Sequence, residues 1–157
     1  MSADVTGSAP GRNARNPLPR AAQPVRRPRA GARPPVFERA FDGGDLYALR
    51  AAVATYVTEV AGEQAAETVV LIAHELCSNA VRHGGGAGRI RLWIAGDDEI
   101  HCEVTDSGPG LTDPEAGRTL PPPSLPGGRG LWIARNMSDV RIVTGPAGTT
   151  VTSVISG

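Results

Sequence analysis

The spacing of apolar residues predicts two successive helices in the first half of the folded part of the chain. Apolar positions recur every three or four residues over 46–60 and predict a helix that ends at Gly62, with Asp45 as its N-cap. A second helix is predicted over 63–82, and residues 83–86 would end it with a glycine in the left-handed cap conformation. Its apolar stripe has helical spacing, so one face should pack on a sheet: Val69, Ile72, Ala73, Leu76 and Ala80.

Alternating positions and turn residues predict strands elsewhere. Strands are expected over 36–41, 89–95, 100–106, 140–144 and 149–155, with the last four forming two hairpins. A short helix is expected over 131–136, and the Gly- and Pro-rich stretch 107–128 should have no regular structure. Helices that come early and antiparallel hairpins that come late favour an α+β fold. We expect a two-layer α/β sandwich with a mixed, mostly antiparallel sheet rather than a doubly wound fold.

The composition excludes several kinds of catalytic and metal-binding site. All 16 basic residues of the 157 are Arg, so a P-loop lysine and Schiff-base chemistry are excluded. The two cysteines, Cys77 and Cys102, are too few for a zinc ribbon or a disulfide framework. The sequence contains no membrane-length apolar run and no signal-peptide pattern, so we expect a cytoplasmic location without a membrane partner.

The net charge is zero, but positive and negative charges are unevenly distributed along the chain. Residues 1–39 carry eight Arg against two acids, which is +6, whereas residues 40–157 carry eight Arg against 14 acids, which is −6. Because the first stretch is rich in Arg, Pro, Gly and Ala, we expect a disordered tail over 1–34 and one folded domain over 35–157. A solvated tail without direct nucleic-acid binding is the simpler expectation. The alternative is an arginine arm that contacts nucleic acid or the acidic body of its own domain.

Three polar groups interrupt the packing pattern. Glu75 and Asn79 are four residues apart on the second predicted helix, so they lie on one face. A carboxylate and an amide in this arrangement offer oxygen ligands for Mg²⁺ and a proton acceptor. As an isolated pair on a helix, however, such residues are more often structural.

Asp106 forms the second group because it ends the apolar row of its strand. The side chains of Ile100, Cys102, Val104 and Asp106 share one face, which predicts an inward-pointing carboxylate that needs a donor. The amino group of a purine would serve, and Gly108 and Gly110 would allow a planar ligand to approach closely. The alternative is an ordinary turn that begins with Asp.

The third group is the glycine cluster 127–130 in front of Leu131 and the short predicted helix. Glycine amides at a helix N-terminus form an anion site without any lysine.

The order of these motifs, Glu75-x-x-x-Asn79, Asp106-x-Gly-x-Gly and Gly128-x-Gly-Leu, resembles the N, G1 and G2 boxes of the GHKL ATP-binding superfamily. That superfamily includes gyrase, heat-shock chaperone ATPases, MutL and histidine kinases. The string ELCSNAVRHG at 75–84 is similar to anti-sigma-factor serine kinases. The string GRGLWIARNMSD at 128–139 is similar to related actinobacterial regulatory ATPases. The resemblance covers residues 36–157.

The resemblance implies roles for individual residues. Glu75 would be the general base, Asn79 would ligate Mg²⁺, and Asp106 would accept a hydrogen bond from the adenine amino group. Glycines of the two later boxes would line the base or place amides against the phosphates, and these are Gly108, Gly110, Gly128 and Gly130 with the adjoining Leu131. Residues 111–126 would form the ATP lid.

Three further positions are less specific. Thr149 matches a threonine that supports the adenine-binding aspartate through water. Arg82 and Arg129 are candidate phosphate contacts, with surface ion pairs as the equal alternative.

The function implied is a Mg²⁺-dependent, ATP-binding serine/threonine protein kinase of the anti-sigma type. It would phosphorylate an anti-sigma-factor antagonist and sequester a sigma factor, and a homodimer would use the early strand and first helix. The alternatives are a catalytically silent ATP-binding module that binds a protein partner, and a histidine-kinase catalytic domain. The latter is disfavoured because the sequence has no upstream helix pair with an acceptor histidine, and no Phe in the lid.

Overall fold

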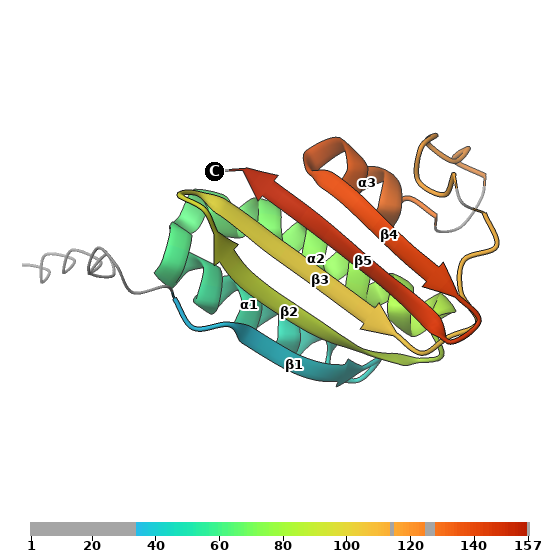
Figure 1. The fold of residues 1–157 in the computed structure, drawn as a ribbon, viewed down its shortest axis with the longest axis horizontal. Helices are drawn as coiled ribbons and strands as arrows, with labels where there is room; N and C mark the ends of the chain where they lie inside the picture. Colours follow the sequence, from blue (N-terminus) through green and yellow to red (C-terminus); the bar gives the residue numbers. More distant parts are fainter. Residues whose placement is uncertain (1–33, 114, 125–127, 157) are drawn as a thin grey trace, which may run out of the picture.

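The computed structural model describes residues 34–113, 115–124 and 128–156, so the predicted tail lies outside the described residues except for Pro34. This part of the chain forms five strands and three helices (Figure 1). In chain order they are β1 Phe37–Asp42, α1 Leu46–Ala61, α2 Glu63–His83, β2 Ala87–Ala95, β3 Glu99–Asp106, α3 Gly130–Met137, β4 Asp139–Gly145 and β5 Gly148–Ser156. None of the helices in the described ranges has both the length and the apolar character needed to cross a membrane.

The strands form one sheet in the order β1-β2-β3-β5-β4, and the helices cover one of its faces (Figure 1). This confirms the predicted two-layer α+β sandwich. Every strand pairing is antiparallel, so the sheet is not mixed. The expected edge strand is β1, shifted by one residue from its predicted bounds.

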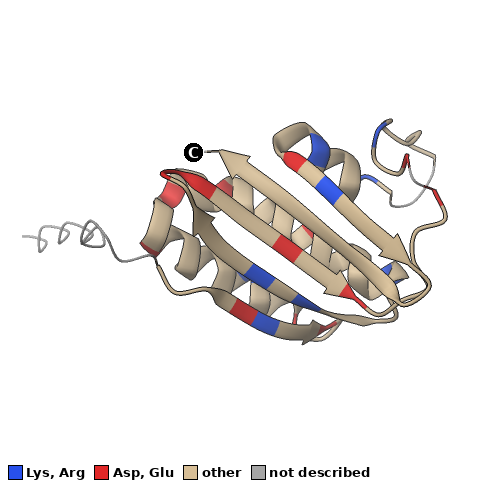
Figure 2. Ribbon diagram, in the orientation of Figure 1, with Lys and Arg blue, Asp and Glu red and all other residues tan. Residues whose placement is uncertain are grey.

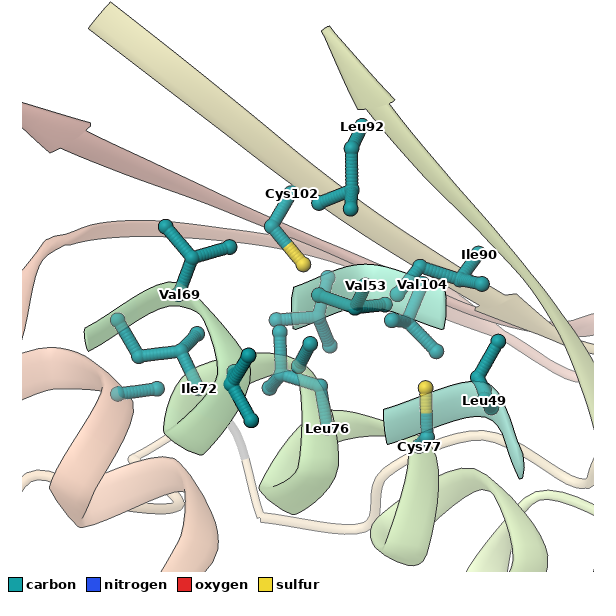
Figure 3. Packing of buried hydrophobic residues seen from close by; sticks show 14 of the residues in the cluster. Leu49, Val53, Val69, Ile72, Leu76, Cys77, Ile90, Leu92, Cys102 and Val104 are labelled. Carbon is teal, nitrogen blue, oxygen red and sulfur yellow. The ribbon is translucent and has the colours of Figure 1, made fainter. Parts of the chain in front are cut away.

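The core lies between the sheet and α1 and α2 (Figure 3). Alternate residues of β2 and β3, such as Ile90 and Val104, face the helices and are almost fully buried. The predicted stripe of α2 is buried against them, as are Cys77 and Cys102. Burial raises the pKa of the Cys77 thiol to about 12 and also raises that of Cys102.

Of the two predicted helix ends, one differs from the structure. Asp45 precedes α1 but makes no side-chain bond to it, because its Oδ2 accepts the Asp42 main-chain N–H at 3.1 Å instead. At the end of α2, Gly84 has φ −102°, but Gly85 and Gly86 have φ +89° and +90°, so the predicted segment 83–86 does contain glycines in the left-handed region. The reason for glycine at position 84 is a contact with β3 that is described below.

Candidate functional site

The fold brings the three polar groups toward one end of the molecule. β3 ends at Asp106, which pairs in register with Gly88 of β2 and Thr149 of β5. The last turn of α2 and the glycines after it lie against this strand end, and α3 begins beside the middle of α2. Motifs separated by some 50 residues of sequence therefore share one region because the sheet and α2 run alongside each other.

Asp106 is partly buried at the end of its apolar row, as predicted. Its Oδ1 accepts two main-chain N–H groups, from Gly108 at 3.0 Å and from Thr149 at 3.2 Å. No group in the described part of the chain donates to Oδ2. Hydrogen bonds to an ionised carboxylate are the stronger kind, so the protein itself holds one oxygen firmly. The second oxygen keeps its capacity to accept.

The glycines around Asp106 allow three chain segments to approach it. A Cβ atom on Gly84 would lie 2.3 Å from Asp106 Oδ2, and one on Gly108 would lie 2.5 Å from the Cα of Gly84. A Cβ atom on Gly148 would lie 2.0 Å from the Asp106 carbonyl oxygen. Real Cβ atoms do not approach so closely, so contacts within the chain already require glycine at these positions. Gly110 has φ +89°, and its added Cβ would lie 2.5 Å from the carbonyl oxygen of Gly145.

The start of α3 meets the polar pair of α2. A Cβ atom on the buried Gly130 would lie 2.9 Å from Glu75 Oε2 and 3.1 Å from Asn79 Nδ2. Both polar side chains are partly buried. The first N–H groups of a helix have no partner within the helix and carry its positive end. Glu75, Asn79 and a helix N-terminus therefore lie within contact distance of one another.

A pair of threonines connects the strand hairpin to the segment after Asp106. Thr144 Oγ1 accepts the Leu111 N–H at 2.8 Å and is 2.9 Å from Thr149 Oγ1. Thr149 is buried, and its main chain reaches Asp106 directly. Thr144 was not predicted. The signal that could have identified it is its place opposite Thr149 across the Gly145–Gly148 turn.

Comparison with known proteins shows the family to which this chain belongs. Residues 42–155 match the family described as the histidine kinase-like ATPase domain. The match covers most of the chain. This protein belongs to that family.

Comparison with solved structures finds histidine kinases, and the first of the two that follow supports the fold. The histidine kinase domain of a blue-light activated histidine kinase from Erythrobacter litoralis is 16% identical, with a TM-score of 0.50 over 74% of this chain and 67% of that chain. The mycobacterial sensor histidine kinase MprB is 18% identical, with a TM-score of 0.48 over 77% of this chain and 98% of that chain. No curated protein matches the sequence.

In this histidine kinase-like ATPase domain, the segment predicted as the lid packs on α3 where it is described. A Cβ atom on Gly117 would lie 2.5 Å from the Leu131 Cβ, and Arg135 Nε donates to the Ala116 carbonyl oxygen at 3.1 Å. Positions 114 and 125–127, which include Gly127 of the glycine cluster, lie outside the described residues. The described lid residues have neither helix nor strand, as predicted.

The remaining predicted positions lie around this domain's motifs. Gly128, with φ +78°, and Arg129 are both exposed just before α3. Arg82 is exposed on the last turn of α2. Among the described residues neither arginine forms an ion pair. Leu131 is buried in the core.

A cavity of about 470 Å³ opens beside Asp106. Its lining combines the motif residues Gly84, Gly85 and Asp106 with Arg89 and Arg91 on the uncovered face of the sheet. In the described ranges, no group of three or more His, Cys, Asp or Glu side chains could hold a metal ion.

Proposed function

We propose that this domain binds Mg²⁺ and ATP between α2, the end of β3 and the start of α3. The observation that carries the proposal is the position of Gly130, whose Cα lies against Glu75 and Asn79. This contact places a helix N-terminus, which favours phosphate, beside an amide and a carboxylate, which offer oxygen ligands to Mg²⁺. Gly128, Arg129, Leu131 and the exposed Arg82 border the same region and would contact or enclose the phosphates.

The adenine end of the site would be Asp106. Its Oδ1 is held by the N–H groups of Gly108 and Thr149, so Oδ2 would accept the hydrogen bond from the adenine amino group. The main-chain bond from Thr149 supports this role without requiring the water that the family resemblance implied.

The side chains of Glu75, Asn79 and Asp106 have the chemical groups that would hold Mg²⁺ and ATP. Mg²⁺ in nucleotide sites is commonly held by one or two side chains together with phosphate oxygens, so the Asn79 carbonyl oxygen would suffice on the protein side. Bound ATP would supply an activated γ-phosphoryl group. Glu75 would accept the proton of the attacking hydroxyl, from a serine or threonine or from water, and the α3 N-terminus would orient the phosphates.

We further propose that the acceptor is a serine or threonine of an anti-sigma-factor antagonist, and that the domain also binds a sigma factor. The strings ELCSNAVRHG at 75–84 and GRGLWIARNMSD at 128–139 support this proposal. A homodimer through β1 and α1 belongs to the same proposal.

The test is transfer of labelled phosphate from ATP to candidate antagonist proteins by the full chain. Replacing Glu75 with Gln should lower the transfer rate by about 10²–10⁴-fold because the general base is removed, while ATP affinity stays near the original value. Glu67→Gln is the matched control, since Glu67 is an exposed acid on the same helix.

Equal transfer rates in Glu75→Gln and the unmodified chain would contradict the base assignment. ATP binding without transfer to any antagonist would contradict the kinase assignment and leave the silent ATP-binding module.

A further inference from the structure

A second cavity lies at the opposite end of the sheet from Asp106. It has a volume of about 110 Å³ and lies between the end of α1, the start of α2 and the turn that joins β2 to β3. Its walls are apolar and its rim is acidic. The apolar lining residues are Val60, Ala61, Ala65, Ile94 and Ile100, and the acidic ones are Asp97 and Asp98.

The surroundings of this cavity are strongly acidic. Glu59 and Glu63 flank the helix junction, and Glu99 follows the turn, so five exposed acids lie at this end (Figure 2). Of these five acids, only Glu99 forms an ion pair with another described residue, His101, at 3.4 Å. We call these five acids and the cavity the acidic end. Uncompensated like charges of this kind favour a cationic partner.

The chain enters the domain beside the acidic end. The Tyr56 hydroxyl donates to the Pro35 carbonyl oxygen at 2.9 Å, and Tyr56 lies one helical turn before Val60 of the cavity wall. The preceding residues, 1–33, contain seven Arg and a single acid, Asp4, which is a net charge of +6. A highly basic segment is therefore covalently joined next to the acidic end.

We propose that residues 1–33 bind the acidic end of their own domain through arginine side chains. Arginine suits this cavity because its aliphatic stem packs on apolar walls while its guanidinium bonds carboxylates at the rim. One arginine would place its stem between α1 and β2 and its guanidinium at Asp97 and Asp98. Others would pair with Glu59, Glu63 and Glu99.

The connection favours this partner over a separate protein. Segments joined by a short linker have a high effective concentration at each other's surface, so weak contacts suffice. The seven arginines and five acids are also complementary in sign. The contact requires no ATP and leaves the Asp106 end open.

The test uses the full chain with a nitroxide at Ser8→Cys and measures the loss of backbone amide signal by NMR. Only the introduced thiol should react, because Cys77 and Cys102 are 1% and 0% exposed. The proposal predicts strong signal loss at residues 97–99 and 59–65 compared with 112–118. Raising the salt concentration from ~0.05 M to ~0.5 M should reverse it, since the screening length becomes much shorter.

Charge-neutral variants locate the contact. Asp97→Asn with Asp98→Asn should strongly reduce the signal loss at the acidic end. Asp113→Asn with Glu115→Gln removes the same charge from the lid segment and should leave the signal loss intact.

Three results would overturn the proposal. The first is signal loss that the Asp97 and Asp98 changes do not reduce. The second is signal loss in a mixture where the nitroxide and the isotope label are on different chains, because the contact would then join two copies. The third is no signal loss at the acidic end, and salt-sensitive binding of a DNA duplex that requires residues 1–33 would then make DNA the partner of this segment.

Discussion

The two oxygens of the Asp106 carboxylate are placed differently. Oδ1 accepts two main-chain N–H groups, and Oδ2 has no donor among the described residues. This asymmetry separates the structural use of the side chain from its proposed use with adenine.

Replacing Asp106 with Asn should therefore weaken ATP binding without unfolding the domain. The Asn carbonyl oxygen still accepts the N–H groups of Gly108 and Thr149, but its NH₂ group would face the adenine amino group, donor against donor. Loss of a hydrogen bond to a charged group predicts about tenfold to a hundredfold weaker ATP binding by calorimetry. The melting temperature should stay near that of the original chain.

Asp106→Ala should lower both the ATP affinity and the melting temperature, because the main-chain N–H groups of Gly108 and Thr149 lose their acceptor. If Asn at this position binds ATP as well as Asp does, Oδ2 is not the adenine contact.

A substitution at Gly84 tests how closely the end of α2 must approach Asp106. Its backbone conformation suits alanine, but the added Cβ would lie 2.3 Å from the Asp106 carboxylate. Gly84→Ala should cost about 1–3 kcal/mol in the free energy of unfolding, as overpacking does, and should weaken ATP binding by displacing the carboxylate. Gly145→Ala is the control, because an added Cβ there meets no atom of the described chain within 4 Å. Equal stability of the two variants in urea would contradict this account.

At the scale of the elements, Thr144 of β4 connects this strand to β5 and to the segment that follows β3. It holds Leu111, the first residue of the predicted lid, and contacts Thr149, whose main chain holds Asp106. The start of the predicted lid and the Asp106 carboxylate are thus fixed by one strand hairpin.

Replacing Thr144 with Val should loosen the start of the lid while leaving the hairpin intact. Loss of one exposed hydrogen bond, worth about 0.5–1.5 kcal/mol, predicts roughly threefold to tenfold weaker ATP binding and faster hydrogen exchange of the Leu111 amide. Thr150→Val is the matched control, since Thr150 bonds Thr105 on the uncovered face of the sheet. Unchanged exchange at Leu111 would show that Thr144 does not hold the lid.

The elements themselves could be predicted because burial follows periodicity. The stripe of α2 and the alternation of β2 and β3 face one core, and their predicted ends differ from the observed ones by at most two residues. The inward direction of Asp106 followed from the same alternation.

The contacts around Asp106 could not be predicted in the same way. The pattern of residues 83–86 indicates only a local helix end, whereas Gly84 contacts a strand end more than 20 residues away. Thr144 bonds Leu111 across 33 residues, and no local pattern encodes such a pairing. Likewise, an Asp at position 45 is typical of a helix N-cap, but its side chain accepts the main-chain N–H of Asp42 instead.

Across the whole molecule, the two proposed sites lie at opposite ends of β3. Glu99 begins this strand at the acidic end and Asp106 finishes it, so seven residue steps of ~3.3 Å separate them. Nothing that binds at one end needs to contact the other. Failure of tail binding would therefore leave the ATP proposal standing, and the converse also holds.

The central claim is an ATP site that recognises adenine through Asp106 Oδ2. Its most direct test is calorimetric titration of the full chain with ATP and, separately, with GTP, both in the presence of Mg²⁺. Adenine presents an amino donor where guanine presents a carbonyl oxygen, so ATP should bind with one molecule per chain and at least about tenfold more tightly than GTP. Equal affinity for the two nucleotides, or no heat with ATP, would contradict the account.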